Sequence, residues 1–289
     1  MDNKDTIVVN GSSGMFSCFT IRLQAIIDYY NKYHKLPVYV DSRYQFSCYK
    51  QHPDEDITHL LLKSPRISKN DQNDLPPTFV WSSSPEENQF SDYEKLNFSV
   101  LKKLVQIYFS PSDNVIETCN FLKEKYNIDI NNTCCIYYRG NDKQTETNLP
   151  SYEEFIIHAK KIQDLNPNMC FLIQTDEEEF NKLCYEQLRN VIHIQENSFF
   201  QTRTMSSRQY VIPNDTKHTH AIYYISTIYL ISQCKYIIHT SGNGELWITL
   251  WRGNSKNMLQ YLNPKEYIHG VYNEFYNPNK TEFWIKHYE

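Results

Sequence analysis

The chain has 289 residues, of which 40% are hydrophobic and 22% charged, a balance typical of a globular protein and not of a disordered one. Its 29 basic and 34 acidic residues give a net charge of -5. This charge argues against a dedicated nucleic-acid-binding protein, which usually presents a basic face, and leaves room for a local phosphate site.

The first forty residues predict a β–turn–α–β unit. A short buried strand at 6–9 is followed by the turn Asn-Gly-Ser-Ser-Gly at 10–14. A helix is predicted over 16–34, and a second strand over 37–40.

Residues 41–90 contain five of the twelve prolines and the run Ser82-Ser83-Ser84-Pro85, and they predict loops and irregular structure. Two helices are predicted after this segment, over 92–108 and 112–126. Ser112 is the expected N-cap of the second helix, because its hydroxyl can accept a hydrogen bond from the first helical turn.

From residue 133 onward, predicted strands alternate with predicted helices. The strands are expected at 133–138, 169–175, 191–194, 235–240 and 257–262. The helices are expected at 151–165, 177–188, 220–234 and 245–252. Ser151 and Glu154 form a capping box that opens the first of these helices. This alternation favours a parallel sheet covered by helices on both faces.

Two such β/α regions in a chain of this length predict an α/β protein of two domains. Each domain is expected to be Rossmann-like, with a doubly wound parallel sheet, and a cleft is expected between them. We place the N-terminal domain at 1–120 and the C-terminal domain at 121–289.

The eight cysteines include no C-x-x-C pair and no cluster with zinc spacing. Several lie in apolar runs, which indicates reduced, buried thiols. The N-terminus does not have the pattern of a signal peptide, and no apolar run reaches the ~18 residues of a membrane span. We therefore expect a cytoplasmic protein.

The residues that follow the predicted strands are the candidates for a ligand site, because parallel sheets bind ligands at the carboxyl ends of their strands. Arg139 follows one strand and can aim its guanidinium at a phosphate. Lys143 and Glu146 come shortly after it, and Glu146 can act as a general base. An ordinary surface ion pair is an equally open interpretation of this loop.

Two further loops end predicted strands. Asp176 follows the second strand, although it also suits a plain helix N-cap. The loop at 240–245 opens a helix, and its glycines allow a ligand close to the backbone. Taken alone, this loop is explained by a simple strand-to-helix turn. Because all three loops follow predicted strands of one sheet, we favour a crevice that the three loops share.

Sharper motifs are absent. The sequence has no dinucleotide fingerprint after a strand, no P-loop and no H-E-x-x-H. Asp54-Glu55-Asp56 matches a D-x-D pattern, but it lies in the irregular segment, where an acidic turn is expected. We therefore expect no metal.

Four segments around these loops and the first helix, at 11–41, 137–161, 171–180 and 231–247, resemble those of the fucosyltransferases. This family includes the α-1,6-fucosyltransferases, the nodulation fucosyltransferases and the protein O-fucosyltransferases. YYRGNDKQTETNLPSYEEFIIHAKK (137–161) resembles the turn and helix that carry the arginine of the family. FLIQTDEEEF (171–180) and ISQCKYIIHTSGNGELW (231–247) are similar to its next two motifs. Residues 11–41, with Gly14, are similar to its first glycine loop and helix.

The resemblance implies a GT-B-like transferase that is inverting, independent of metal and specific for GDP-fucose and a carbohydrate acceptor. It implies that the domain at 1–120 is the acceptor-side domain and that the domain at 121–289 binds the donor. It implies that Arg139 binds the β-phosphate and that Glu146, assisted by Lys143, deprotonates the acceptor. The implied donor-binding residues, besides Arg139, are Gly14, Tyr137, Asp142, Asp176, Ser241, Gly242 and Asn243.

Three positions depart from the family. Its second arginine in the turn corresponds to Gly140, a serine of the third loop to Asn243, and its guanine-binding aspartate to Thr227. Two alternatives therefore stay open: the same fold with another nucleotide sugar, and a degenerate glycan-binding protein without catalysis. Retention of Arg139 and Glu146 argues against the second.

Overall fold

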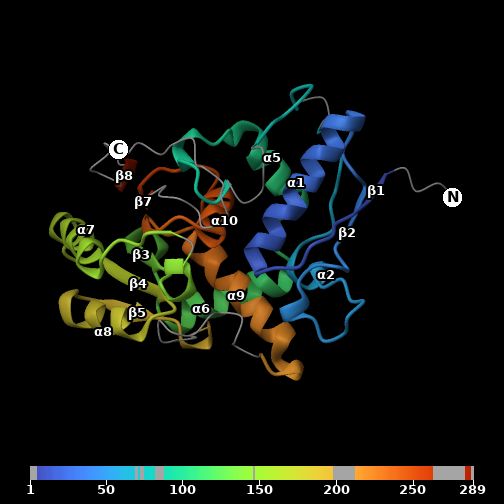
Figure 1. Cartoon of the computed structure of the whole chain (residues 1–289). Helices are drawn as coiled ribbons and strands as arrows, with labels where there is room; N and C mark the ends of the chain where they lie inside the picture. Colours follow the sequence, from blue (N-terminus) through green and yellow to red (C-terminus); the bar gives the residue numbers. More distant parts are fainter. Residues whose placement is uncertain are drawn as a thin grey trace.

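The computed structural model describes residues 5–68, 71, 75–81, 88–145, 147–197, 212–262 and 284–287. Within these residues, the second half of the chain forms a six-stranded sheet, and the first half forms a two-stranded one (Figure 1).

The large sheet has the strand order β5-β4-β3-β6-β7-β8. Its strands are β3 (Thr133–Tyr138), β4 (Cys170–Thr175), β5 (Val191–His193), β6 (Tyr236–His239), β7 (Met258–Tyr261) and β8 (Trp284–His287). Neighbours pair in parallel, except that β8 runs antiparallel to β7 at the edge. The expected parallel, helix-covered α/β architecture is confirmed for this half, and β8 is an addition to it.

Alternation along the strands explains why both faces of this sheet are covered. In β3, Cys135 and Tyr137 belong to one hydrophobic cluster, while Cys134, Ile136 and Tyr138 belong to another on the opposite face. All six residues of β3 are buried. Such a strand has no solvent-facing side, so only its ends can present polar groups to a ligand.

Helices of the second half lie on both faces of the sheet (Figure 1). Their bounds are α7 (Tyr152–Leu165), α8 (Glu178–Gln187), α9 (Lys217–Ile231) and α10 (Asn243–Arg252). Residues of α7 and α8 share a cluster with one face, and residues of α9 and α10 share a cluster with the other. The predicted capping box of Ser151 and Glu154 is present at the start of α7.

The first half contains a β–α–β unit followed by short elements. Its bounds are β1 (Thr6–Val8), α1 (Met15–Tyr33), β2 (Tyr39–Asp41), α2 (Thr58–Leu61), α5 (Phe98–Tyr108) and α6 (Asp113–Lys125). β1 and β2 pair in parallel. Short 3-10 turns (η1 to η5 and η7) lie at Ser47–Tyr49, Tyr93–Lys95, Ile130–Asn132, Asn141–Thr145, Gln195–Asn197 and Asn214–Thr216.

The helix predicted over 92–108 begins only at Phe98, which corrects that prediction. Tyr93 explains the delay, because its backbone N–H donates to Gln260 Oε1 at 3.1 Å and its hydroxyl donates to the Gly242 carbonyl at 3.0 Å. These two bonds hold the backbone at Tyr93 against the second half of the chain, so the helix begins only after this segment. The N-cap prediction for Ser112 is confirmed, since its Oγ accepts from the Val115 N–H at 3.3 Å.

One hydrophobic cluster connects the two halves. Phe19 of α1 packs on Phe109, which follows α5, and on Trp247 of α10, with ring centroids 5.6 Å and 5.2 Å away. The Trp247 indole donates to Thr20 Oγ1 at 3.0 Å, so the buried tryptophan is satisfied by the opposite half. The predicted boundary at 120/121 falls inside α6, whose Val115 carbonyl accepts from Ser226 of α9.

All eight cysteines are free thiols, and six of them are buried. Among the described helices, none combines the length and apolar character needed to cross a membrane.

Candidate functional site

The predicted strand-end loops lie side by side because β3 is flanked by β4 and β6. Tyr138, the last residue of β3, pairs with Thr175 at the end of β4. Tyr137 pairs with His239 at the end of β6. Arg139, Asp176 and Thr240 therefore begin three adjacent loops at the carboxyl edge of one parallel sheet.

Arg139 and Asp176 face each other across this edge. Arg139 Nε lies 4.0 Å from Asp176 Oδ2, and the two side chains are 35% and 23% exposed. Asp176 Oδ1 accepts from the Gly140 N–H at 2.9 Å. Burial raises the pKa of Asp176 to about 6, and the Arg139 guanidinium opposes this rise. The pair places a cation, held by a carboxylate, at the end of the central strand.

The turn after Arg139 is anchored by Glu177, a residue that the sequence analysis did not single out. Glu177 is 3% exposed, and its Oε1 accepts from the Asn141 N–H at 2.9 Å. Its other oxygen accepts from the Tyr152 hydroxyl. A Cβ at Gly140 would lie 2.2 Å from Glu177 Cδ. Glycine at this position, where the resembling family has its second arginine, is therefore required by the packing of Glu177.

Lys143 points toward the first half of the chain. It is 5% exposed, its Nζ donates to Gln89 Oε1 at 3.0 Å, and it lies 5.0 Å from the centre of the Phe90 ring. The same Gln89 oxygen accepts from Asn243 Nδ2 at 3.3 Å. Gln89 thus connects two predicted site residues, from two different loops, to a segment that the sequence predicts only as irregular.

Asn243 opens α10 and contacts the start of α1. Its Oδ1 accepts from Thr20 Oγ1 at 2.7 Å, and its Nδ2 donates to Ser17 Oγ at 3.1 Å. Gly14 is the N-cap of α1, one turn before Ser17. No atom lies within 4 Å of a Cβ placed on Gly14. The glycine loop is therefore open at Gly14.

Ser241 and Gly242 are held by the surrounding protein. The Ser241 hydroxyl donates to the Tyr261 carbonyl at 2.8 Å and accepts from Gln260 Nε2 at 2.8 Å. Gly242 exchanges hydrogen bonds with the Tyr93 hydroxyl through its N–H and its carbonyl. These contacts fix the shape of the loop; the predicted phosphate-lining role of both residues stays a prediction.

Tyr137 lies behind Arg139 in an aromatic layer. Tyr224 lies next to it, and burial raises the pKa of both phenols. A Cβ at Gly244 would lie 2.7 Å from the Tyr137 hydroxyl oxygen, so glycine lets α10 approach. His220 stacks between Tyr224 and Tyr49, with ring centroids 6.2 Å and 6.0 Å apart.

This aromatic layer joins the two halves beside Arg139. Burial lowers the pKa of His220 to about 4, so its imidazole is neutral at pH 7. The spacing of His220 and Tyr224 by four residues on α9 is the signal that sequence reasoning missed. Thr227, one turn further, is fully buried and donates to the Tyr223 carbonyl at 2.9 Å, so it faces the protein interior.

Some predicted residues are not placed. The side chain of Asp142 and all of Glu146 lie outside the described residues; the backbone of Asp142 belongs to the turn at Asn141–Thr145. Among the residues that the structure describes, no group of three or more His, Cys, Asp or Glu side chains has the arrangement of a metal site. In the D-x-D segment, Glu55 contacts His218 at 3.0 Å, and Asp56 accepts from the Ser42 and Thr58 N–H groups.

The arrangement combines a cation from one half with neutral hydrogen-bonding groups from the other. Arg139 and Asp176 supply charge at the sheet edge, and Lys143 and Asn243 meet Gln89, Ser17 and Thr20. Such a site can hold an anionic group by charge and a polyhydroxylated group by hydrogen bonds.

Comparison with known proteins gives matches to structures only. No protein-family model matches the sequence, and no curated protein matches it. The NodZ α-1,6-fucosyltransferase soaked with GDP-fucose is 11% identical, with a TM-score of 0.54 over 86% of this chain and 92% of that one. The same enzyme co-crystallised with GDP is 10% identical, with a TM-score of 0.54 over 90% and 93%.

A third structure, fucosyltransferase NodZ from Bradyrhizobium, is 11% identical, with a TM-score of 0.51 over 90% of this chain and 94% of that one. Each match extends over most of both chains. The chain therefore has a fucosyltransferase-like, GT-B-like α/β fold.

Proposed function

We propose that the chain is an inverting glycosyltransferase that transfers fucose from GDP-fucose to a hydroxyl of a carbohydrate acceptor without a metal ion. The observation that carries the proposal is the placement of Arg139. It follows the last residue of the central strand of a mainly parallel sheet and lies 4.0 Å from Asp176, which follows the neighbouring strand. The fold supports it, since the similar NodZ structures were obtained with GDP-fucose and with GDP.

In this proposal, the diphosphate of the donor lies against Arg139. The acceptor oxygen attacks the anomeric carbon from the opposite side, the bond from that carbon to the phosphate oxygen breaks, and GDP leaves with the electron pair. A single in-line displacement inverts the anomeric configuration. Arg139 stabilises the charge that develops on the leaving phosphate, which is where preorganised cations lower a barrier most.

The acceptor proton passes to Glu146 in the same proposal. Glu146 lies outside the described residues, and its role rests on its position in the sequence, three residues after Lys143. Lys143 and Asn243 contribute hydrogen bonds on the side of the first half, where Gln89 now occupies both donors. A ligand oxygen can take the place of the Gln89 oxygen at these donors.

The test is a comparison of GDP, UDP, ADP and CMP by calorimetry and thermal unfolding, each with and without EDTA. We expect selective stabilisation by GDP that EDTA leaves unchanged. GDP-fucose would then be incubated with carbohydrate acceptors, and the anomeric configuration of the product would be read by NMR.

Each other outcome removes a definite part of the proposal. A preference for another nucleotide keeps the fold and changes the donor. This comparison tests base selection directly, because Thr227, at the position of the family's guanine-binding aspartate, faces the protein interior. Loss of binding with EDTA contradicts metal independence. Absence of binding to all four nucleotides contradicts catalysis and favours a degenerate glycan-binding protein.

A further inference from the structure

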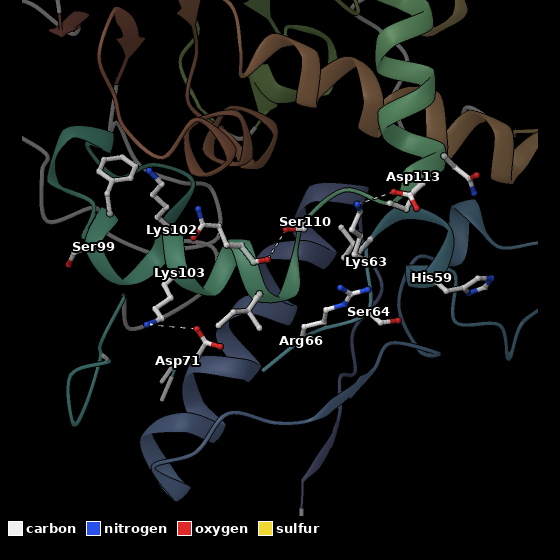
Figure 2. Close-up of a pocket in the computed structure, with 16 residues that line it drawn as sticks. His59, Lys63, Ser64, Arg66, Asp71, Ser99, Lys102, Lys103, Ser110 and Asp113 are labelled. Carbon is white, nitrogen blue, oxygen red and sulfur yellow. Dashed lines mark hydrogen bonds and ion pairs between the residues drawn. The ribbon is translucent and has the colours of Figure 1, made fainter. Parts of the chain in front are cut away.

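A cavity of about 970 Å³ opens in the first half of the chain, and we name it the basic groove (Figure 2). Lys63 and Arg66, from the segment after α2, lie on one side of it. Lys102 and Lys103 of α5 lie on the other side, and α6 begins at its end.

The basic groove has the opposite charge to the chain. Its lining contains the four cations just named, against the two carboxylates of Asp71 and Asp113, a net charge of +2. The whole chain has a net charge of -5. Cations concentrated in one concave site on an acidic protein raise the local concentration of anions.

Two of the four cations are already paired, and two are not. Lys63 Nζ lies 2.9 Å from Asp113, and Lys103 Nζ lies 4.0 Å from Asp71. Within the part of the chain that the structure describes, the charged groups of Arg66 and Lys102 have no ion pair or hydrogen bond. These two come from opposite sides of the groove, so its unneutralised charge is spread over both sides (Figure 2).

The remaining lining is suited to a sugar. Ser64, Gln106 and Asn114 are exposed and add neutral donors and acceptors. Leu62 and Ile107 add apolar surface, against which the C–H face of a sugar ring can pack. A volume of about 970 Å³ is at the upper end for small-molecule pockets, so one phosphate ion would leave most of the groove empty.

The basic groove is separate from the candidate active site. The Lys102 side chain packs against Gly253, where its Cδ lies 3.2 Å from the position of a Cβ. Gly253 is the C-cap of α10, whereas Asn243 opens the same helix at the candidate active site. A helix of ten residues is about 15 Å long, which separates the two sites by at least roughly that distance.

We propose that the basic groove binds an anionic carbohydrate, a sugar chain that carries at least two phosphate, sulfate or carboxylate groups. Arg66 and Lys102 contact two of these groups, and the neutral side chains contact the sugar hydroxyls. Nucleic acid is the less suited polyanion, because the lining offers only the rings of Phe98 and His59, whereas single strands bind on several stacked rings. This proposal does not depend on the function proposed for the candidate active site.

The experiment measures binding of a sulfated heparin hexasaccharide, its desulfated counterpart and a six-nucleotide single-stranded DNA by calorimetry. The test variant is Arg66→Gln/Lys102→Gln, which keeps both stems and removes both charges. The matched control is Arg189→Gln/Lys161→Gln, two exposed residues outside the groove. Thermal unfolding and GDP binding check that the fold and the candidate active site are intact in both variants.

We expect the sulfated sugar to bind, the desulfated sugar not to bind, and added salt to weaken the affinity. The test variant should raise the Kd at least about tenfold, and the control variant should leave it unchanged. Equal affinity of the test and control variants would overturn the proposal. Equal binding of the DNA through the same two residues, or no binding of any probe, would also overturn it.

Discussion

The two halves of the molecule present their polar groups in different ways. In the second half, Arg139 follows a strand that is buried on both faces, and Asp176 follows the neighbouring strand. In the first half, Gln89 comes from an irregular segment, and Ser17 and Thr20 come from one face of α1. The regular half supplies the charges, and the irregular half supplies neutral groups that meet Lys143 and Asn243.

This difference indicates which half stabilises the transition state and which half selects the acceptor in the proposed reaction. A sheet edge holds a charge in place because several strands fix its position at once, which suits the group that must stabilise a transition state. Loops and helix faces tolerate changes of sequence more readily, which suits the selection of an acceptor. The comparison predicts different consequences for substitutions in the two halves.

Arg139→Ala should have the largest effect. We expect GDP release from GDP-fucose, with a carbohydrate acceptor, to slow by about 100- to 1000-fold, because a preorganised cation at the leaving group is lost. The unfolding midpoint should change little, since the side chain is 35% exposed. Arg189→Ala is the control, and normal turnover by Arg139→Ala would break the assignment of charge to the second half.

Gly140→Ala should be next. Its Cβ would lie 2.2 Å from Glu177 Cδ, so Glu177 must move away from the Asn141 N–H. We expect the free energy of unfolding to fall by about 3 kcal/mol in urea denaturation. Gly14→Ala is the matched control in the first half, where nothing lies within 4 Å of the new atom. Equal losses in the two variants would show that the turn after β3 is no more constrained than the glycine loop.

Gln89→Ala tests the connection between the halves. The buried Lys143 would lose one acceptor, and Asn243 would lose another, so we expect a loss of about 2 kcal/mol in the free energy of unfolding. Gln187→Ala removes a similar bond, Lys160 to Gln187 at 2.8 Å, from an exposed site, and should cost far less. If the two variants lose the same stability, Gln89 does not connect the halves in the folded state.

Asp176→Asn should have the smallest effect on stability at acid pH, and its effect grows as pH rises. The folded-state pKa of about 6 is above the ordinary value of 3.8, so the folded chain keeps a proton that the unfolded chain loses between these values. This group therefore makes the free energy of unfolding fall as pH rises from about 4 to 6. The variant removes this dependence.

Urea denaturation at pH 4 and pH 7.5 measures the effect. The stability of Asp176→Asn relative to the parent chain should be about 2 kcal/mol higher at pH 7.5 than at pH 4. Asp164→Asn, which replaces an exposed carboxylate near the end of α7, serves as the control. A constant difference between the variant and the parent chain at both pH values would contradict the burial of Asp176.

The two halves also differ in how far their structure can be predicted from the sequence. β3 was predicted to the residue and β4 within one residue, because a continuous apolar run bounded by polar residues has few alternatives. The adjacency of Arg139 and Asp176 follows from the parallel pairing of these two strands. Local signals therefore specified the frame of the site in the second half.

The contacts of the first half depend on long-range packing that no local pattern reports. Gln89 lies in a segment rich in serine and proline, and its partners are 54 and 154 residues away along the chain. Glu177 reads locally as one more acid at a helix start, yet it is buried beneath the turn of Gly140 and Asn141. β8 is only four residues long and has no clear apolar run, so its pairing with β7 is not predicted from the sequence.

The hydrogen bond from Trp247 to Thr20 joins residues 227 positions apart within a cluster that contains side chains of both halves. A change on either side alters the fit on the other, so neither half is free to diverge on its own. Homologues that replace Thr20 by a residue without a side-chain acceptor are expected to lose the ring N–H at position 247 as well, since a buried N–H without its acceptor is costly. The seam between the halves should therefore be visible in evolution as paired substitutions, even where the loops around it vary independently.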